Sequence, residues 1–129
     1  MAKNHADYTL TFRTLSEVVS HTADEQVGVL FNEPTDFGSW AVHWRARIAK
    51  EPQADAERGA RMKRANPAFI PRNHRVEEVI RAAVDRSDFA PFEQLLEVLT
   101  KPYDDQPANT VYMAGPKPNE IVLQTFCGT

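Results

Sequence analysis

Apolar residues recur every three or four positions through much of this chain, the spacing that places side chains on one face of an α-helix. In residues 73–85 the stripe is Val76, Val79, Ile80 and Ala83. After Asp88, a good N-cap residue, a second stripe consists of Phe92, Leu95, Leu96 and Leu99. Because only a short loop at Arg86-Ser87 separates the two stripes, the pattern predicts an antiparallel helical hairpin with the stripes facing each other.

The first half of the chain shows the same spacing. Tyr8, Phe12, Leu15 and Val19 predict a helix from Asp7, its cap, to about Ser20. A short helix is expected over 26–31, and Pro34 opens the next one, whose stripe is Phe37, Trp40, Ala41, Trp44 and Ile48. Residues 51–64 are mostly polar and predict a surface helix. The fold class expected is therefore all-α.

Four of the nine prolines, Pro102, Pro107, Pro116 and Pro118, fall in the last 28 residues, where a long helix is disfavoured. We therefore expect a small bundle of about five to six helices in residues 1–107 and an irregular, extended, proline-rich tail in 108–129. Ile121, Leu123 and Phe126 alternate with other residues, which fits an extended segment against an apolar surface. That surface need not belong to this chain.

Composition narrows the function classes. The chain has 129 residues, 42% hydrophobic and 26% charged, with a formal net charge of -3. This balance gives no bulk attraction to nucleic acid or anionic lipid, so neither is an expected partner. No apolar run approaches membrane-spanning length, and the first residues lack the apolar core of a signal peptide, so we expect a cytoplasmic protein. The one cysteine excludes an internal disulfide framework.

Candidate chemistry is sparse. No glycine-rich phosphate loop is present, and the four histidines have no metal-ligand spacing with one another or with Cys127. Adjacent carboxylates Glu77-Glu78 diverge by about 100° on a helix and cannot share a proton, whereas Asp104-Asp105 suits a turn better than a metal. The sequence therefore predicts no catalytic, cofactor-binding or metal-binding residue.

Three features keep two interpretations each. The tryptophans Trp40 and Trp44 lie four positions apart, which suits either an aromatic platform or, preferably, a core contact. Arg72 and His74 stand at the start of the hairpin. Their side chains have either a chemical role at a site or a structural role, such as an ion pair between Arg72 and Asp104-Asp105. A basic cluster is either a phosphate-binding surface or, preferably, a solvated helical face neutralised by nearby carboxylates. Its members are Arg58, Arg61, Lys63 and Arg64.

Several short motifs occur in an order that resembles one family. They are Asp7-Tyr8-Thr9, Trp40 to Arg47, Asn66-Pro67, Arg72-Asn73, Asp88-Phe89, Pro102 to Pro107 and the closing Thr125-Phe126-Cys127-Gly128-Thr129. Together they resemble the C-terminal region of the SelO (YdiU) family of protein adenylyltransferase pseudokinases. The resemblance covers nearly the whole chain.

The resemblance implies a parent protein with a kinase-like core that transfers AMP from ATP to Ser, Thr or Tyr hydroxyls of other proteins, with ATP and magnesium bound in the larger N-terminal part. None of those ligands maps onto this sequence, so we expect the chain alone to be inactive and to have the kinase-like core as its partner. The resemblance also implies a redox role for Cys127, since SelO-like proteins carry a selenocysteine or cysteine at this place. The alternatives are a free-standing helical interaction module and a thiol-redox protein.

Overall fold

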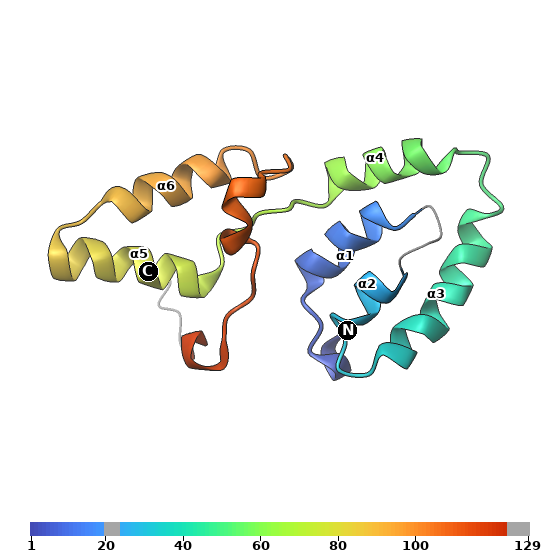
Figure 1. Cartoon of the computed structure of the whole chain (residues 1–129), viewed down its shortest axis with the longest axis horizontal. Helices are drawn as coiled ribbons and strands as arrows, with labels where there is room; N and C mark the ends of the chain where they lie inside the picture. The colour runs from blue at the N-terminus through green and yellow to red at the C-terminus, as the bar shows by residue number, and fades with distance from the viewer. Residues whose placement is uncertain (20–23, 124–129) are drawn as a thin grey trace, which may run out of the picture. The chain divides into compact units, whose positions relative to one another are not determined.

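The computed structural model describes residues 1–19 and 24–123, and this part of the chain is helical without any strand. Its α-helices are α1 (Tyr8–Glu17), α2 (Asp24–Gly28), α3 (Pro34–Ile48), α4 (Asp55–Ala65), α5 (Asn73–Arg86) and α6 (Ala90–Leu99), drawn in Figure 1. Short 3-10 helices cover Ala2–Asn4, Pro107–Tyr112 and Pro118–Glu120. The all-α prediction is confirmed.

By its internal contacts the chain forms two compact units, unit 1 (Met1–Ala68) and unit 2 (Phe69–Thr129). The division expected from the prolines, a helical domain 1–107 and a tail 108–129, stays a prediction about domain organisation. Within the tail, the described part of the proline-rich segment forms two short 3-10 helices and no long helix.

In unit 1, α1 begins directly after Asp7, the cap residue that the sequence predicts. The Asp7 side chain accepts a hydrogen bond from the Leu10 N–H at 2.9 Å, which satisfies one of the open donors of the first turn of α1. The helix ends at Glu17, before the expected Ser20, and α2 begins two residues before the predicted Gln26. Element type is therefore predicted better than element ends.

The core of unit 1 draws on α1, α2 and α3. Its buried residues are Leu15, Val18, Val27, Phe37 and Ala41, with Phe12, Phe31, Trp44 and Met62 packed partly against them. The predicted stripe of α3 is thus confirmed at Phe37, Ala41 and Ile48, all at most 8% exposed, whereas Trp40 is 45% exposed. Helix α4 packs on α1, and Gly59 marks their close approach: a Cβ there would lie 3.0 Å from the Ser16 carbonyl oxygen.

Unit 2 contains the predicted hairpin, α5 packed against α6. Ser87 closes α5 in the left-handed conformation, with φ of 52°, and Asp88 Oδ1 accepts from the Ala90 N–H at 3.1 Å. The capping residue of α6 by backbone geometry is Phe89, one position after the predicted Asp88. The hairpin is confirmed, and its cap is displaced by one residue.

The predicted stripes of the hairpin are only partly buried, which corrects the sequence analysis. Ala82, Leu95 and Val98 are the buried apolar residues of the two helices, whereas Ile80, Phe92 and Leu96 are 49–51% exposed. The reason is geometric: an apolar stripe of a helix is broad, and a single neighbouring helix covers only part of it. The remainder faces outward in the described structure.

Candidate functional site

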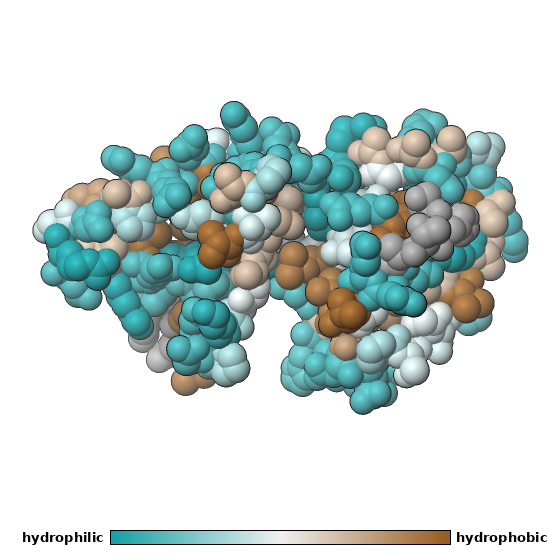
Figure 2. Space-filling view, in the orientation of Figure 1, coloured by the Kyte–Doolittle hydropathy of each residue, from teal (hydrophilic) through white to brown (hydrophobic). Residues whose placement is uncertain are grey.

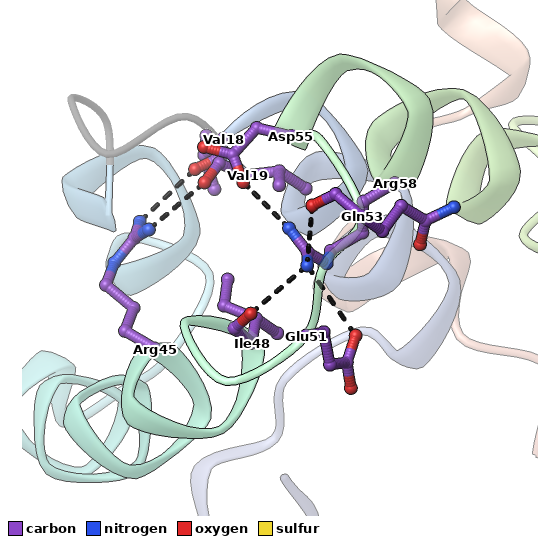
Figure 3. A network of polar contacts seen from close by, with 8 residues as sticks. All are labelled: Val18, Val19, Arg45, Ile48, Glu51, Gln53, Asp55 and Arg58. Carbon is purple, nitrogen blue, oxygen red and sulfur yellow. Dashed lines mark hydrogen bonds and ion pairs between the residues drawn. The ribbon is translucent and has the colours of Figure 1, made fainter.

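Arg58 does not belong to a basic surface. Its guanidinium is buried, the residue being 4% exposed, and it donates to the carbonyl oxygens of Ile48 and Gln53 at 3.1 Å each (Figure 3). It also pairs with Asp55 at 2.7 Å. Both interpretations of Arg58 from sequence, a phosphate ligand and a solvated residue, are therefore wrong. The side chain ties the α3–α4 connection to the start of α4.

Arg45 acts in the same way at the end of α1. It donates to the Val18 and Val19 carbonyl oxygens at 3.2 Å each, as Figure 3 shows, and it pairs with Asp24. The hydrogen bond that Arg45 donates to the Asp24 carboxylate raises the pKa of Arg45. A cation that donates to helix-end carbonyls also complements the helix dipole. Arg45 therefore stabilises the fold of unit 1.

The rest of the predicted basic cluster is dispersed. Arg61 and Arg64 are exposed on α4, while Lys63 pairs with Glu17 of α1 at 3.5 Å. With Arg58 turned inward, the cluster does not present four cations on one face. A concentrated phosphate-binding surface on α4 is not formed.

The tryptophan pair shows features of both interpretations, a core contact at Trp44 and an exposed aromatic ring at Trp40. The rings of Trp40 and Trp44 stack with centroids 5.8 Å apart and an interplanar angle of 10°, and the Arg45 guanidinium lies 5.3 Å from the Trp44 centroid. Trp44 packs on the core, whereas Trp40 is 45% exposed beside an apolar groove of about 380 Å³ that Phe12 and Phe37 also line. The cation over this aromatic pair is supplied by the protein's own Arg45.

The most unusual polar residue of unit 2 is His74, in the first turn of α5. It is 7% exposed, and neither Nδ1 nor Nε2 has a hydrogen-bond partner among the described residues. Burial lowers the pKa of His74, and the nearby Arg75 lowers it further. The imidazole is therefore held neutral, with one unused donor and one unused acceptor.

His74 lines two grooves between α5 and the segment 116–123. The larger has a volume of about 750 Å³ and extends along α5 past Glu77, Glu78 and Arg81. The smaller, about 290 Å³, lies at the start of α5 beside Arg72 and Asn73. These grooves are the candidate ligand-binding region of unit 2.

The carboxylates near these grooves are already engaged. Glu78 pairs with Arg75 at 2.8 Å and Glu77 with Arg81 at 3.0 Å, so the two diverge as predicted. Glu120 accepts from the Lys117 N–H at 2.9 Å, and this bond lowers the pKa of Glu120. The walls therefore carry fixed charges of both signs.

The other predicted positions give no assembled centre. The Asp104 N–H donates to the Lys101 carbonyl at 3.2 Å, in keeping with the turn expected there. Residues 1–19 and 24–123 contain no group of three His, Cys, Asp or Glu side chains placed to hold a metal ion. In the same residues, no helix has both the length and the apolar character to cross a membrane. Cys127, the predicted redox residue, and Phe126 lie outside the described residues.

Sequence reasoning missed one feature of unit 2, an exposed apolar face on the hairpin. We call it the hairpin face, and it consists of Ile80, Val84, Phe89, Phe92 and Leu96, which are 49–75% exposed. Hydrophobic surface interrupts the polar surface over α5 and α6 in Figure 2. The signal was present in the breadth of the two stripes, but periodicity does not say how much of a stripe is covered.

Over residues 1–19 and 24–123 the structure defines an all-α protein of two compact units. The chain belongs to the SelO family: the model of the family described as "Protein adenylyltransferase SelO" matches residues 1–100. It is 57% identical over 129 residues to "Protein nucleotidyltransferase YdiU" of Bradyrhizobium sp. strain BTAi1. Proteins of the same name from Rhizobium etli and Rhizobium meliloti are 54% and 52% identical over 130 residues. All of this chain is covered, but it spans only 26% of the length of each relative.

Proposed function

We propose that this chain is the C-terminal helical region of a SelO-like protein that transfers AMP from ATP to Ser, Thr or Tyr hydroxyls of other proteins. Its role there is structural or regulatory, and the ATP and magnesium sites belong to the rest of the parent. Identity of 52–57% along the whole chain to proteins named nucleotidyltransferases supports the proposal. The length of the relatives also supports the proposal. The chain spans 26% of each relative, so each is about four times as long as this chain.

The hairpin face is the observation that carries the structural role. The hairpin face presents two large exposed apolar side chains on each helix and a fifth, Phe89, just before α6, and exposed apolar patches mark interaction surfaces. Full burial of one such side chain contributes about 1.5–3 kcal/mol, so covering this face would supply much of the stability of an interface. Its occupant in our proposal is the kinase-like N-terminal core of the same parent, in keeping with the greater length of the relatives.

A binding experiment tests this role. The 129-residue chain and the remainder of the parent are produced separately, and their affinity is measured by calorimetry. Leu96→Asp places a charge in the hairpin face and should weaken binding at least about tenfold. Val42→Asp is the matched control, because Val42 is 67% exposed on α3 in unit 1. Equal affinity for both variants and the unchanged chain would refute the proposed surface.

A second experiment tests the division of labour in catalysis. Radiolabelled ATP is incubated with an acceptor protein and either this chain or the whole parent. We expect AMP incorporation with the parent and none with the chain, because nucleotidyl transfer needs cationic groups on the phosphates and ligands for a divalent metal. Incorporation by the chain alone would contradict the proposal.

We also propose that Cys127 is a redox element that forms a reversible disulfide with a cysteine elsewhere in the parent. A thiol reacts as its thiolate, so exposure and pKa control its reactivity. Differential alkylation of the oxidised and reduced parent, followed by peptide mass spectrometry, identifies the pairing. Complete alkylation of Cys127 under oxidising conditions would exclude a disulfide there.

The hairpin face also favours a second function, a free-standing helical interaction module, with a different protein as its occupant. The gene distinguishes the two. A reading frame that continues upstream of the Met1 codon into a kinase-like core supports the SelO-like parent and excludes the module.

A further inference from the structure

The N-terminus of α5 has the character of an anion site. No side chain caps this 14-residue helix, since Arg72 occupies the capping position without a side-chain hydrogen bond to the first turn. The first N–H groups of a helix have no acceptor within the helix and carry a partial positive charge. Asn73 is exposed at this end, beside the groove of about 290 Å³. The first-turn N–H groups of α5 therefore have no side-chain cap and lie beside this groove.

His74 provides an independent observation at the same place. Its side chain lines both grooves, yet the residue is only 7% exposed and both ring nitrogens lack a hydrogen-bond partner among the described residues. A buried polar group without a partner costs about 1–3 kcal/mol, so such a group calls for an explanation, and a bound ion is one of them. The His74 ring therefore keeps one N–H donor and one acceptor that no described residue uses, at a position beside both grooves.

The charges around His74 favour an oxyanion. Arg72, 8% exposed, directly precedes α5, and the half-buried Arg75 follows His74 in its first turn. The facing carboxylates, Glu78 and Glu120, are held by Arg75 and by the Lys117 N–H respectively. Arginine and helix N-terminal N–H groups are the usual donors to phosphate in proteins.

We propose that the groove at the N-terminus of α5 binds a phosphate group, with the His74 ring and the first N–H groups of α5 as donors and Arg72 as the nearby positive charge. This site goes beyond the proposed function, because it needs neither the hairpin face nor the rest of the parent. The phosphate group comes either from inorganic phosphate or from a phosphate monoester.

Phosphate titration into the 129-residue chain at constant ionic strength tests the site. Nuclear magnetic resonance follows the His74 ring and the Asn73 and His74 amides. We expect saturation below about 10 mM, localised to these signals, and a rise in the pKa of His74 as the dianion binds. Parallel titrations with O-phosphoserine and with sulfate compare a monoester and another oxyanion, and the tighter phosphate compound identifies the source.

Three variants make the test specific. His74→Leu removes the ring donor and should weaken phosphate binding about tenfold, whereas Glu120→Gln removes a facing negative charge and should strengthen it about threefold. Arg81→Leu is the control, because Arg81 lines the larger groove away from the helix end and pairs with Glu77. We expect it to leave the affinity within about twofold.

Some outcomes overturn the proposal. Shifts that do not saturate, or that are equal in the His74→Leu, Glu120→Gln and Arg81→Leu variants, indicate an adventitious ion only. His74→Leu is used only if circular dichroism shows that it folds. If it does not fold, the test uses the phosphate affinity of the Glu120→Gln variant and the phosphate-induced shift of the His74 ring signals in the unchanged chain. If phosphate does not shift the His74 ring signals of the unchanged chain, the site is refuted. None of these results depends on binding to the rest of the parent.

Discussion

The two units consist of similar amphipathic helices but differ in how much of their apolar surface is buried. In unit 1, helices α1 to α4 surround a core that includes Leu15, Val27 and Phe37. The buried Arg58 and the half-buried Arg45 donate hydrogen bonds to carbonyl oxygens at helix ends. In unit 2 the helices α5 and α6 bury only Ala82, Leu95 and Val98 among their apolar residues and leave the hairpin face exposed. A fold with a closed core is stable by its own packing, whereas a two-helix hairpin with an open face is completed by whatever covers it.

The largest expected effect compares the same substitution in each unit. Phe37→Ala removes a side chain that is 3% exposed and should destabilise unit 1 by about 4 kcal/mol, whereas Phe92→Ala, 49% exposed, should cost unit 2 less than about 1 kcal/mol. Urea unfolding measures both. Both tryptophans lie in α3, so their fluorescence reports on unit 1, and hydrogen exchange of α5 amides reports on unit 2. Comparable losses of unfolding free energy in the two units would show that they do not differ in how well their apolar residues are buried.

The next effect tests the arginines of unit 1. Arg58→Ala should destabilise unit 1 by about 3 kcal/mol, because the Ile48 and Gln53 carbonyls and Asp55 lose a buried partner. Arg61→Ala, on the exposed side of the same helix, is the control and should change the unfolding free energy by less than about 0.5 kcal/mol. A small effect at both positions would mean that Arg58 does not fasten the helix end.

A smaller effect is expected from two glycine-to-alanine substitutions, which test how tightly the helices of unit 1 are packed. Gly38→Ala in α3 should stabilise by about 0.5–1 kcal/mol, because alanine favours helix and the new Cβ meets nothing within 4 Å. Gly59→Ala in α4 has the same propensity gain but brings its Cβ to 3.0 Å from the Ser16 carbonyl oxygen. Thermal unfolding should therefore show Gly59→Ala to be the less stable variant. The reverse order would show that α1 and α4 separate readily.

The smallest effect is a difference in pH dependence. The pKa of His74 is lowered from 6.5 by burial, so its contribution to unit 2 is fully present above pH 6.5 and is lost as the pH falls toward the folded-state value. In unit 1, the hydrogen bond from Asn4 lowers the pKa of Asp36 from 3.8, so that contribution is lost only below pH 3.8. Hydrogen exchange from about pH 8 to about pH 5 should show a pH-dependent loss in α5 that His74→Gln removes. A loss that persists in His74→Gln would assign it to another group.

Sequence periodicity predicted the helices of both units, because an amphipathic repeat is a local property of the chain. The Asp7 cap and the hairpin loop at Arg86-Ser87 followed from local chemistry in the same way. The absence of phosphate-loop and metal-ligand spacing, and the family resemblance, could also be recognised directly. Each of these can be recognised from residue types and their spacing along the chain, without knowledge of tertiary contacts.

Only the tertiary structure decided which polar and apolar residues are covered. Arg58 is one of four basic residues on a polar helix by sequence, yet it is buried because the α3–α4 connection brings carbonyls around it. Phe92 and Leu96 have the spacing of core residues, yet they are exposed because α5 covers only part of α6. His74 is an ordinary hairpin residue by sequence, yet it is buried and lines a groove with residues of the segment 116–123, which is distant in sequence. Burial depends on neighbours far away in sequence, which a local pattern does not contain.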